Sequence, residues 1–410
     1  MNTLTNPQWR NVRLGDIGQS LIGLTYSPGN VKRSGTLVLR SSNIQDGELA
    51  FDDNVYVDCA IPEKIRTREN DILICVRNGS RRLIGKSAIL DRRVSGQTFG
   101  AFMAVYRSDL NPFLRYFFQS DDFKRQIDEH LGATINQITN GSLNGFVVTL
   151  PSKSEQQAIT ERLQDVDRLI ATLKRLISKK QAIKQGMMQE LLTGRTRLSG
   201  FTKPWKNISI ARHSHLKARI GWQGLTTGEY LQSGSYKLIG GTDFRNARID
   251  WESASFVSKW RFDQDRNIQL RVNDVLITKD GTIGKVAIVD SLPFPATLNS
   301  GVFVVRPIQG AYESRFLYWL LRSSVFENFI ASLSAGSTIN HLYQKDLITL
   351  TLAFPEDASE QREISSVLDD AESEIRVLEA RLETARNIKQ GMMQELLTGR
   401  TRLPVEEVSS

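Results

Sequence analysis

The chain has 410 residues, a formal net charge of +8 at pH 7, and 40% hydrophobic and 8% aromatic residues. This length allows two to four domains with ample cores, and the composition is that of a globular protein. Two cysteines and four histidines argue against a disulfide framework or a structural zinc site, and the pair His213 and His215 has no third ligand nearby. Neither a signal-like start nor a run of 18 apolar residues is present, so we expect a cytoplasmic protein without membrane contact.

A β-loop-β unit is the clearest local feature of the first 151 residues. The apolar run at 70–76 predicts a buried strand, and it leads into the basic loop at 77–82. Ile-Gly-Lys at 84–86 then opens a second strand at 88–90. The other elements expected in this block are a strand at 37–40, a polar turn at 41–43, an amphipathic helix at 112–130, a polar loop at 132–136 and a strand at 147–151. These elements together predict an α/β domain over residues 1–151.

A long helix is expected over residues 152–199. Pro151 favours a boundary there, and Ser152 with Glu155 fits a capping box. Apolar residues then alternate in steps of four and three, which is a coiled-coil seam. The expected seam residues are Ile159, Leu163, Val166, Ile170, Leu173 and Ile177, followed on a shifted face by Met187 and Leu191. About 40 residues at 1.5 Å each would give a rod of roughly 60 Å.

The same order of elements returns in residues 200–355. A strand at 273–278 runs into the loop Lys-Asp-Gly-Thr at 279–282, and Ile-Gly-Lys at 283–285 opens the next strand at 286–289. The remaining expected elements are a strand at 236–239 with a polar turn at 240–243, a helix at 312–333, a polar loop at 336–340 and a strand at 349–355. We therefore expect a second α/β domain that resembles the first.

A second long helix is expected over residues 356–403, before a short tail at 404–410. Ser359 could cap it, although a start nearer Pro355 also fits. Its expected seam and interface residues are Ile364, Leu368, Ile375, Leu378, Leu382, Met392 and Leu396.

The sixteen residues IKQGMMQELLTGRTRL occur twice, at 183–198 and at 388–403. A repeat of this length indicates a duplicated unit of block and helix. Gly194 and Gly399 are natural left-handed stops at the helix ends. Gly186 and Gly391 lie inside the helices, where each costs about 1 kcal/mol relative to alanine. Because the glycine recurs in both copies, we expect another backbone to approach closely there, although a tolerated defect is the simpler alternative.

The charge is unevenly distributed among these segments. Residues 1–151 carry +3, residues 152–199 carry +5, residues 200–355 carry +6 and residues 356–410 carry −6. The two helices therefore have opposite charges, which favours their pairing with each other. The excess on the two blocks suits a polyanionic ligand such as DNA.

We find no motif that predicts catalysis. Gly85-Lys86-Ser87 resembles the end of a phosphate loop, but Ser80 stands where that loop requires glycine. Asn111-Pro112-Phe113 lacks the second proline of an amino-methyltransferase motif and reads better as a helix start. No metalloprotease, serine-hydrolase or dinucleotide-binding pattern is present. The chain is therefore expected to bind rather than to catalyse.

In this order of elements the chain resembles the specificity subunit of type I restriction–modification systems. The resemblance covers nearly the whole chain, and a few short motifs carry it. These motifs are Leu-Gly-Asp-Ile at 14–17, Asn-Asp-Ile-Leu at 70–73, Asn-Asp-Val-Leu at 273–276, the two Ile-Gly-Lys turns, the helix entries with Glu-Gln at 155–156 and 360–361, and the repeated Lys-Gln-Gly-Met-Met-Gln-Glu-Leu-Leu-Thr-Gly. The second block departs from the pattern, because Ile210-Ala211 replaces Leu-Gly-Asp-Ile.

The resemblance implies two target recognition domains, each reading one half of a bipartite, asymmetric double-stranded DNA site. The two helices would form an antiparallel coiled-coil spacer that sets the gap and binds two methyltransferase subunits, with two restriction subunits joining the complex. S-adenosylmethionine, ATP and Mg would then be bound by those partners and not by this chain.

Polar side chains on the loops are the candidates for DNA contact, because arginine pairs well with guanine and asparagine with adenine. In the first block they are Arg77, Asn78, Arg81, Arg82, Lys86, Ser41, Ser42, Asn43, Asn136 and Gln137. In the second block they are Lys279, Asp280, Thr282, Lys285, Thr242, Asp243, Arg245, Asn340 and His341. Each could instead be an ordinary exposed loop residue. Because the loops differ between the blocks, we expect two different half-sites.

Two other functions remain open at this point. A coiled-coil scaffold that binds only proteins would lack salt-dependent DNA affinity. A self-contained DNA-modifying enzyme would bind S-adenosylmethionine without partners.

Overall fold

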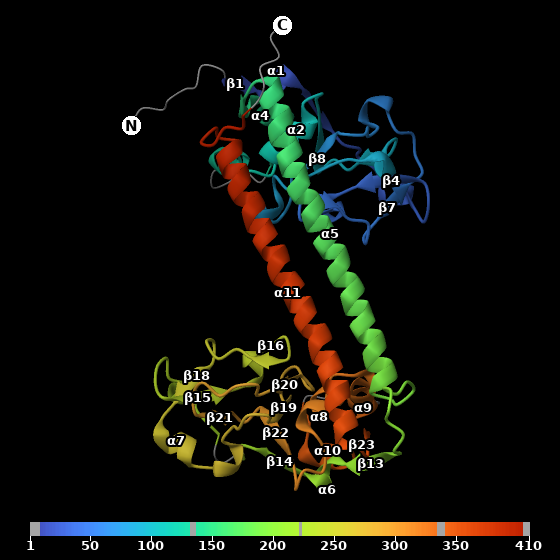
Figure 1. Ribbon diagram of the computed structural model, residues 1–410. Helices are drawn as coiled ribbons and strands as arrows, with labels where there is room; N and C mark the ends of the chain where they lie inside the picture. Colours follow the sequence, from blue (N-terminus) through green and yellow to red (C-terminus); the bar gives the residue numbers. More distant parts are fainter. Residues whose placement is uncertain (1–8, 132–136, 221–223, 334–340, 405–410) are drawn as a thin grey trace. The chain divides into compact units, whose positions relative to one another are not determined.

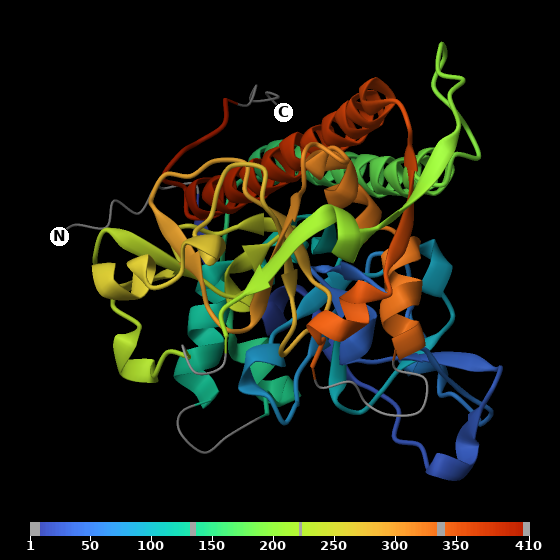
Figure 2. The ribbon, with the colours of Figure 1, turned by 90° about the horizontal axis from the view of Figure 1, so that it is seen from below.

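The computed structural model describes residues 9–131, 137–220, 224–333 and 341–404, and the chain divides into two compact units. Unit 1 is Met1–Lys174 with Arg381–Ser410, and unit 2 is Arg175–Ala380. Each unit therefore contains one α/β block, part of the helix α5 (Lys153–Leu191) and part of the helix α11 (Ala358–Leu396). Figures 1 and 2 show these elements coloured along the sequence.

The block of unit 1 is a mixed α/β fold built on β8 (Ile72–Cys75). One sheet has the strand order β2 (Gln19–Ile22), β11 (Met103–Arg107), β8, β9 (Ser87–Ile89). A second sheet has the order β10 (Thr98–Phe99), β4 (Thr36–Leu39), β7 (Val55–Val57), β3 (Val31–Lys32). Two further pairs are β1 (Arg10–Arg13) with β12 (Val147–Leu150), and β5 (Ile44–Gln45) with β6 (Glu48–Leu49). Its helices are α1 (Leu14–Ile17), α2 (Asn111–Phe117), α3 (Asp121–Leu131) and α4 (Asn140–Gly145).

The block of unit 2 repeats this plan around β19 (Val275–Thr278). One sheet has the strand order β14 (Ser214–Ala218), β22 (Val302–Pro307), β19, β20 (Val286–Ile288), β17 (Arg248–Ile249), β16 (Phe244–Arg245). A second sheet has the order β18 (Ser255–Val257), β15 (Tyr236–Ile239), β21 (Ala296–Leu298). β13 (Trp205–Ser209) pairs with β23 (Thr351–Pro355). Its helices are α6 (Ile210–His213), α7 (Lys259–Asp263), α8 (Ser314–Leu321), α9 (Ser324–Leu333) and α10 (Gln344–Ile348). β13 pairs with β23 as β1 pairs with β12, so the second opening folds like the first despite its different residues.

Each central strand is buried throughout because both of its faces are covered. Successive side chains of a strand point to opposite faces. In unit 1, Ile72 and Ile74 join the core formed with α2 and α3, whereas Leu73 and Cys75 join the core formed with β4 and β10. All four residues of β19 are buried in the same way. This explains why both segments read as continuous apolar runs.

The repeated Asn-Asp before each central strand has a structural role. Asn70 and Asn273 adopt left-handed backbone conformations with φ of 68° and 70°, which asparagine tolerates better than most residues. The following aspartates are almost fully buried and accept two hydrogen bonds each from an arginine at the end of the neighbouring strand. Arg306 Nε lies 2.6 Å from Asp274 Oδ1 and Arg306 Nη2 lies 2.7 Å from Asp274 Oδ2. The motif therefore anchors β8 to β11 and β19 to β22.

The two long helices form an antiparallel pair within each unit, as the seam predicted. In unit 1, Lys389 of α11 lies 2.8 Å from Asp167 of α5. In unit 2, Lys184 of α5 lies 3.2 Å from Glu372 of α11. The expected seam residues Ile159, Leu163, Ile170, Leu173, Ile177, Ile364, Leu368, Ile375 and Leu378 are all buried. Val166 and Leu382 are partly buried.

Each unit is completed by the end of the helix that begins in the other unit. Met393 and Leu396 of α11 enter the core of unit 1, and Met188 and Leu191 of α5 enter the core of unit 2. Beyond the helix ends, a side chain at Gly399 would lie 3.3 Å from the ring of Trp9, and one at Gly194 would lie 3.2 Å from the ring of Trp205. Both glycines have positive φ, as expected of left-handed helix stops.

The helix boundaries needed three corrections. Single helices were expected at 112–130 and 312–333, but each is broken, because Ser120 and Ser323 accept hydrogen bonds from the amides of the turn that follows. Ser152 Oγ accepts from the amide of Glu155, but the Glu155 side chain does not complete the capping box. It bonds Trp9 and Arg402 instead. Asp357, rather than Ser359, accepts the amide hydrogen bond at the start of α11.

Candidate nucleic-acid interface

In unit 1 the loops that follow β4 and β8 meet the loop before β11. The Asn78 amide nitrogen lies 3.5 Å from Ser41 Oγ, and the Arg77 backbone amide donates to the Phe102 carbonyl at 3.1 Å. Arg77 also pairs with Gln137 in an isolated β-bridge. We call this set, residues 40–42, 77–78, 102 and 137, the first loop cluster. Arg77, Asn78, Ser41, Ser42 and Gln137, expected separately from the sequence, are thus brought together by the fold.

The first loop cluster borders a pocket of about 580 Å³, lined by Arg40, Ser41, Ser42, Asn78 and Phe102 among others. Arg40 is held by Asp53, whose carboxylate lies 2.8 Å from Arg40 Nη2. Arg40 Nε and Ser42 Oγ are buried and have no hydrogen-bond partner within the described residues. Buried polar atoms without a partner are uncommon in folded proteins. The pocket therefore retains hydrogen-bonding capacity that the chain itself does not use.

Phe102 is a feature of this cluster that the sequence did not reveal. Its side chain is 59% exposed, and the Arg77 guanidinium carbon lies 5.2 Å from its ring centroid. An exposed aromatic ring beside a cation offers both an apolar face and a positive charge. In the sequence, Phe102 only extends the apolar run of β11, and this is why it carried no separate signal.

The rest of the basic loop faces elsewhere. Arg81, Arg82 and Lys86 line a different groove, of about 590 Å³, with residues of α3. Arg81 Nη2 lies 3.4 Å from Asp128 Oδ1. The basic loop at 77–82 is therefore divided, with Arg77 and Asn78 in the first loop cluster and Arg81 and Arg82 in this groove. Gly85 has φ of +86° and would meet Ile127 if it carried a side chain, so the Ile-Gly-Lys turn is fixed against α3.

A corresponding second loop cluster occurs in unit 2. The Lys279 amide donates to the Gly301 carbonyl at 2.8 Å, and the Leu342 amide donates to the Lys279 carbonyl at 2.8 Å. Asp280 contacts His341, whose ring centroid lies 4.5 Å from that of the exposed Tyr343. Thr278 Oγ1 donates to the Thr282 carbonyl at 2.6 Å. We define this cluster as residues 279–282, 301, 341 and 343.

Several of the remaining candidates hold their own turns together or lie outside the two loop clusters. Asn43 is fully buried and holds its own turn by bonding Arg40, Ala50 and Asn54. Asp243 is also buried, where desolvation raises its pKa, and it accepts the Gly240 amide at 2.7 Å. Both were expected to contact DNA, but the structure places them inside their turns, where their polar atoms already have hydrogen-bond partners. Arg245 pairs with Asp250, and Thr242 and Lys285 are exposed. Asn136 and Asn340 lie outside the described residues.

The two units differ where β2 and β14 end. Gly23 follows β2, and a side chain there would lie 2.2 Å from the Gly100 carbonyl. The matching residue after β14 is Arg219, which is 1% exposed and donates to the Leu298 carbonyl at 2.8 Å and to Thr297 Oγ1 at 3.2 Å. Burial lowers the pKa of Arg219, since no carboxylate bonds its guanidinium among the described contacts. The sequence pattern did not point to this residue.

The repeated sequence lies partly inside the fold and partly on the surface. Leu191 and Leu396 are buried, and Met187 and Met392 are partly buried. No described atom lies within 4 Å of a side chain built at Gly186 or Gly391, so the close backbone approach expected there does not occur within the described chain. Ile183 and Ile388 are 45% and 52% exposed. An apolar residue exposed at the same place in both copies suits a binding surface.

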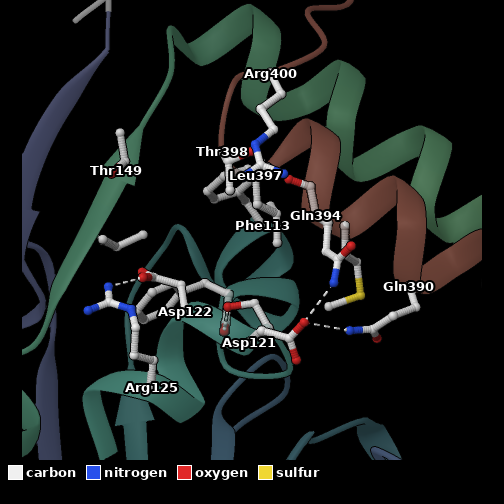
Figure 3. Close-up of a pocket in the computed structure, with 14 residues that line it drawn as sticks. Phe113, Asp121, Asp122, Arg125, Thr149, Gln390, Gln394, Leu397, Thr398 and Arg400 are labelled. Carbon is white, nitrogen blue, oxygen red and sulfur yellow. Dashed lines mark hydrogen bonds and ion pairs between the residues drawn. The ribbon is translucent and has the colours of Figure 1, made fainter. Parts of the chain in front are cut away.

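In unit 1 the second copy of the repeat lines a groove of about 460 Å³ against α2 and α3 (Figure 3). Gln390 and Gln394 both donate to Asp121 Oδ2, at 3.1 and 2.8 Å. Arg400 and Thr398 lie at the other end of this groove. The lining of the groove combines these polar side chains with apolar ones such as Phe113 and Leu397.

Among the described residues, no cluster of side chains could hold a metal ion, and no helix is long and apolar enough to span a membrane.

Comparisons with known proteins agree with this architecture. The family model described as the type I restriction modification DNA specificity domain matches residues 6–184 and 224–386. A putative type I restriction enzyme specificity subunit of Methanocaldococcus jannaschii, MjaX, is 24% identical over 96% of this chain and 94% of its own length. The EcoKI specificity subunit of Escherichia coli is 27% identical over 46% of this chain and 41% of its own. The solved S subunit from M. genitalium is 15% identical with a TM-score of 0.60, covering 97% of this chain and 98% of that one.

Proposed function

Since the chain belongs to the type I restriction–modification DNA specificity family, we propose that it reads a bipartite DNA site and leaves the chemistry to partner subunits. Unit 1 reads one half-site and unit 2 the other. The observation that carries this proposal is the pair of loop clusters, which sit on like scaffolds but carry unlike side chains. Like scaffolds suit a duplex with two similar faces, and unlike loops suit an asymmetric sequence.

Each cluster has the chemistry that base reading requires. Arginine and asparagine side chains can make paired hydrogen bonds to guanine and adenine, at about 1–3 kcal/mol of discrimination for each good pair. In unit 1, Arg77 and Asn78 supply these groups, and exposed Phe102 offers an apolar contact for a thymine methyl group. In unit 2, Lys279 and His341 supply donors. The surrounding lysines and arginines would hold the phosphates and fix the register.

The paired helices set the gap between the half-sites and bind two methyltransferase subunits. The repeat supports this role, because a surface that occurs twice suits a partner that is present twice. Ile183 and Ile388, with the open positions Gly186 and Gly391, form matching exposed strips on α5 and α11. The methyltransferases would bring S-adenosylmethionine, and restriction subunits would bring ATP and Mg.

The test is to map modified bases in DNA exposed to the assembled methyltransferase complex. Arg77→Ala should relax one half-site only, by about tenfold at the affected base. Lys279→Ala should affect only the other half-site. Arg92→Ala, which removes an exposed arginine paired with Glu69 outside both clusters, is the control. If the Arg77 and Lys279 variants altered the same half-site, or neither altered any base preference, the proposed division of reading would be wrong.

A further inference from the structure

In each unit, a carboxylate near the middle of a long helix joins the α/β block to both α5 and α11. In unit 1 it is Asp167 of α5, and in unit 2 it is Glu372 of α11. Their positions in the sequence differ by 205 residues, the same interval that separates the two copies of the repeat. We call these groups the carboxylate nodes.

The node of unit 1 connects the block with both helices. Tyr116 of α2 donates to Asp167 Oδ2 at 2.9 Å, and Arg115 Nη2 lies 3.2 Å from the same oxygen. From α11, Lys389 Nζ lies 2.8 Å from Asp167 Oδ1, and it also lies 5.6 Å from the centre of the Tyr116 ring. The side chains of Lys389 and Asp167 are only 18% and 19% exposed, so solvent screens this contact weakly.

The node of unit 2 also combines a carboxylate with an arginine of the block, a lysine of the opposite helix and an aromatic ring. Arg322, which follows α8, places Nη2 2.7 Å from Glu372 Oε1. Lys184 of α5 lies 3.2 Å from the same oxygen and 5.9 Å from the ring centre of Trp319. Lys184 and Lys389 are equivalent residues of the repeat, so one lysine of each copy binds a carboxylate of the opposite helix above an aromatic ring of the block. The aromatic ring under the lysine is Tyr116 in unit 1 and Trp319 in unit 2, but the arrangement of lysine, carboxylate and ring is the same.

We propose that the carboxylate nodes are positioning elements that fix each block against the helix pair, and so restrict the gap lengths that the protein accepts between half-sites. This inference rests on the proposed function. The physical reason is that a buried, multiply bonded charge tolerates little displacement, because moving any partner leaves a charge unpaired. Apolar helix packing alone permits more sliding, since contacts between methyl and methylene groups are not directional. Asp167, Glu372 and the two lysines act through the blocks and touch no base.

The test uses the assembled methyltransferase complex and a library of duplexes. The library keeps both half-sites, determined first by sequencing modified bases in randomised DNA, and varies only the gap. For Asp167→Asn and Glu372→Gln we expect unchanged half-sites and a broader gap profile, with the preference for the best gap over its one-base-pair neighbours falling on the order of tenfold. Lys184→Arg, which keeps the charge, should retain the original profile.

The matched control is Glu374→Gln, two residues from Glu372 on α11. Glu374 is 50% exposed and pairs with Lys180 at 2.7 Å outside the node, so its loss should leave the gap profile unchanged. Reduced total methylation with an unaltered gap profile in both node variants would show that the nodes only stabilise the fold, and it would overturn the inference. The proposed function fails separately, if the unsubstituted complex shows no half-site preference at all.

Discussion

The buried pair of Asp274 and Arg306 offers a direct test of what holds unit 2 together. Asp274 is 2% exposed and accepts three hydrogen bonds, two from Arg306 and one from the Arg271 amide at 2.7 Å. The pair joins the start of β19 to the end of β22, which are neighbouring strands of the six-stranded sheet. Asp274→Ala would remove the carboxylate and leave the arginine without its counter-charge.

The expected loss can be estimated from what remains around Arg306. Breaking a buried ion pair by removing one partner costs about 3–5 kcal/mol. The Arg306 side chain is 12% exposed and keeps hydrogen bonds to the carbonyls of Asn267 and Gln269, so some of its interactions survive. We therefore expect the lower end of that range, about 3 kcal/mol in the free energy of unfolding of unit 2.

Urea unfolding followed by tryptophan fluorescence suits this measurement, because five of the six tryptophans lie within residues 175–380. The control is Asp263→Ala, which removes an exposed partner of Lys259 on α7 and should change little. Adding Arg306→Met to Asp274→Ala should recover part of the loss, since no unpaired charge then remains buried. A loss under about 1 kcal/mol for Asp274→Ala would refute the claim that this pair anchors the strands.

Three further outcomes follow from the same contacts. Glu372 is desolvated, yet Arg322 and Lys184 hold its pKa below the usual 4.5. Its contribution to stability is therefore present above pH 4.5 and is lost as the pH falls through its folded pKa. In Glu372→Gln the free energy of unfolding should fall less steeply as the pH is lowered, and an unchanged dependence on pH would contradict this. Four residues inserted into both α5 and α11 at facing positions lengthen each helix by about 6 Å, so modified-base mapping should show the same half-sites with a gap longer by about one or two base pairs; altered half-sites at the original gap would argue against a spacer. The purified chain should neither methylate nor cut DNA and should not bind S-adenosylmethionine in calorimetry, whereas activity without partners would favour the enzyme alternative.

The sequence alone determined the duplication, the two α/β blocks, the two long helices and their apolar seam. These features are local or periodic. An apolar run such as that of β8 predicts a buried strand without knowledge of its neighbours in the sheet. Apolar residues spaced alternately by four and three predict a helix seam without knowledge of the partner helix. The resemblance to specificity subunits depended on the same short motifs and was confirmed by the family match.

Only the tertiary structure decided which polar side chains of the loops are used by their own turns and which line a pocket. Asn43 and Ser42 are neighbours in one polar turn, but the first bonds its own backbone and the second lines the pocket. The exposure of Phe102 beside Arg77 and the burial of Arg219 against Leu298 both depend on the pairing of strands that are far apart in the sequence. The sequence also did not predict that the end of α11 completes unit 1. Trp9 and Arg402 both donate to Glu155, and contacts between residues so far apart in the sequence leave no periodic pattern. Local patterns determine elements, whereas the partners of a polar side chain depend on contacts between residues far apart in the sequence.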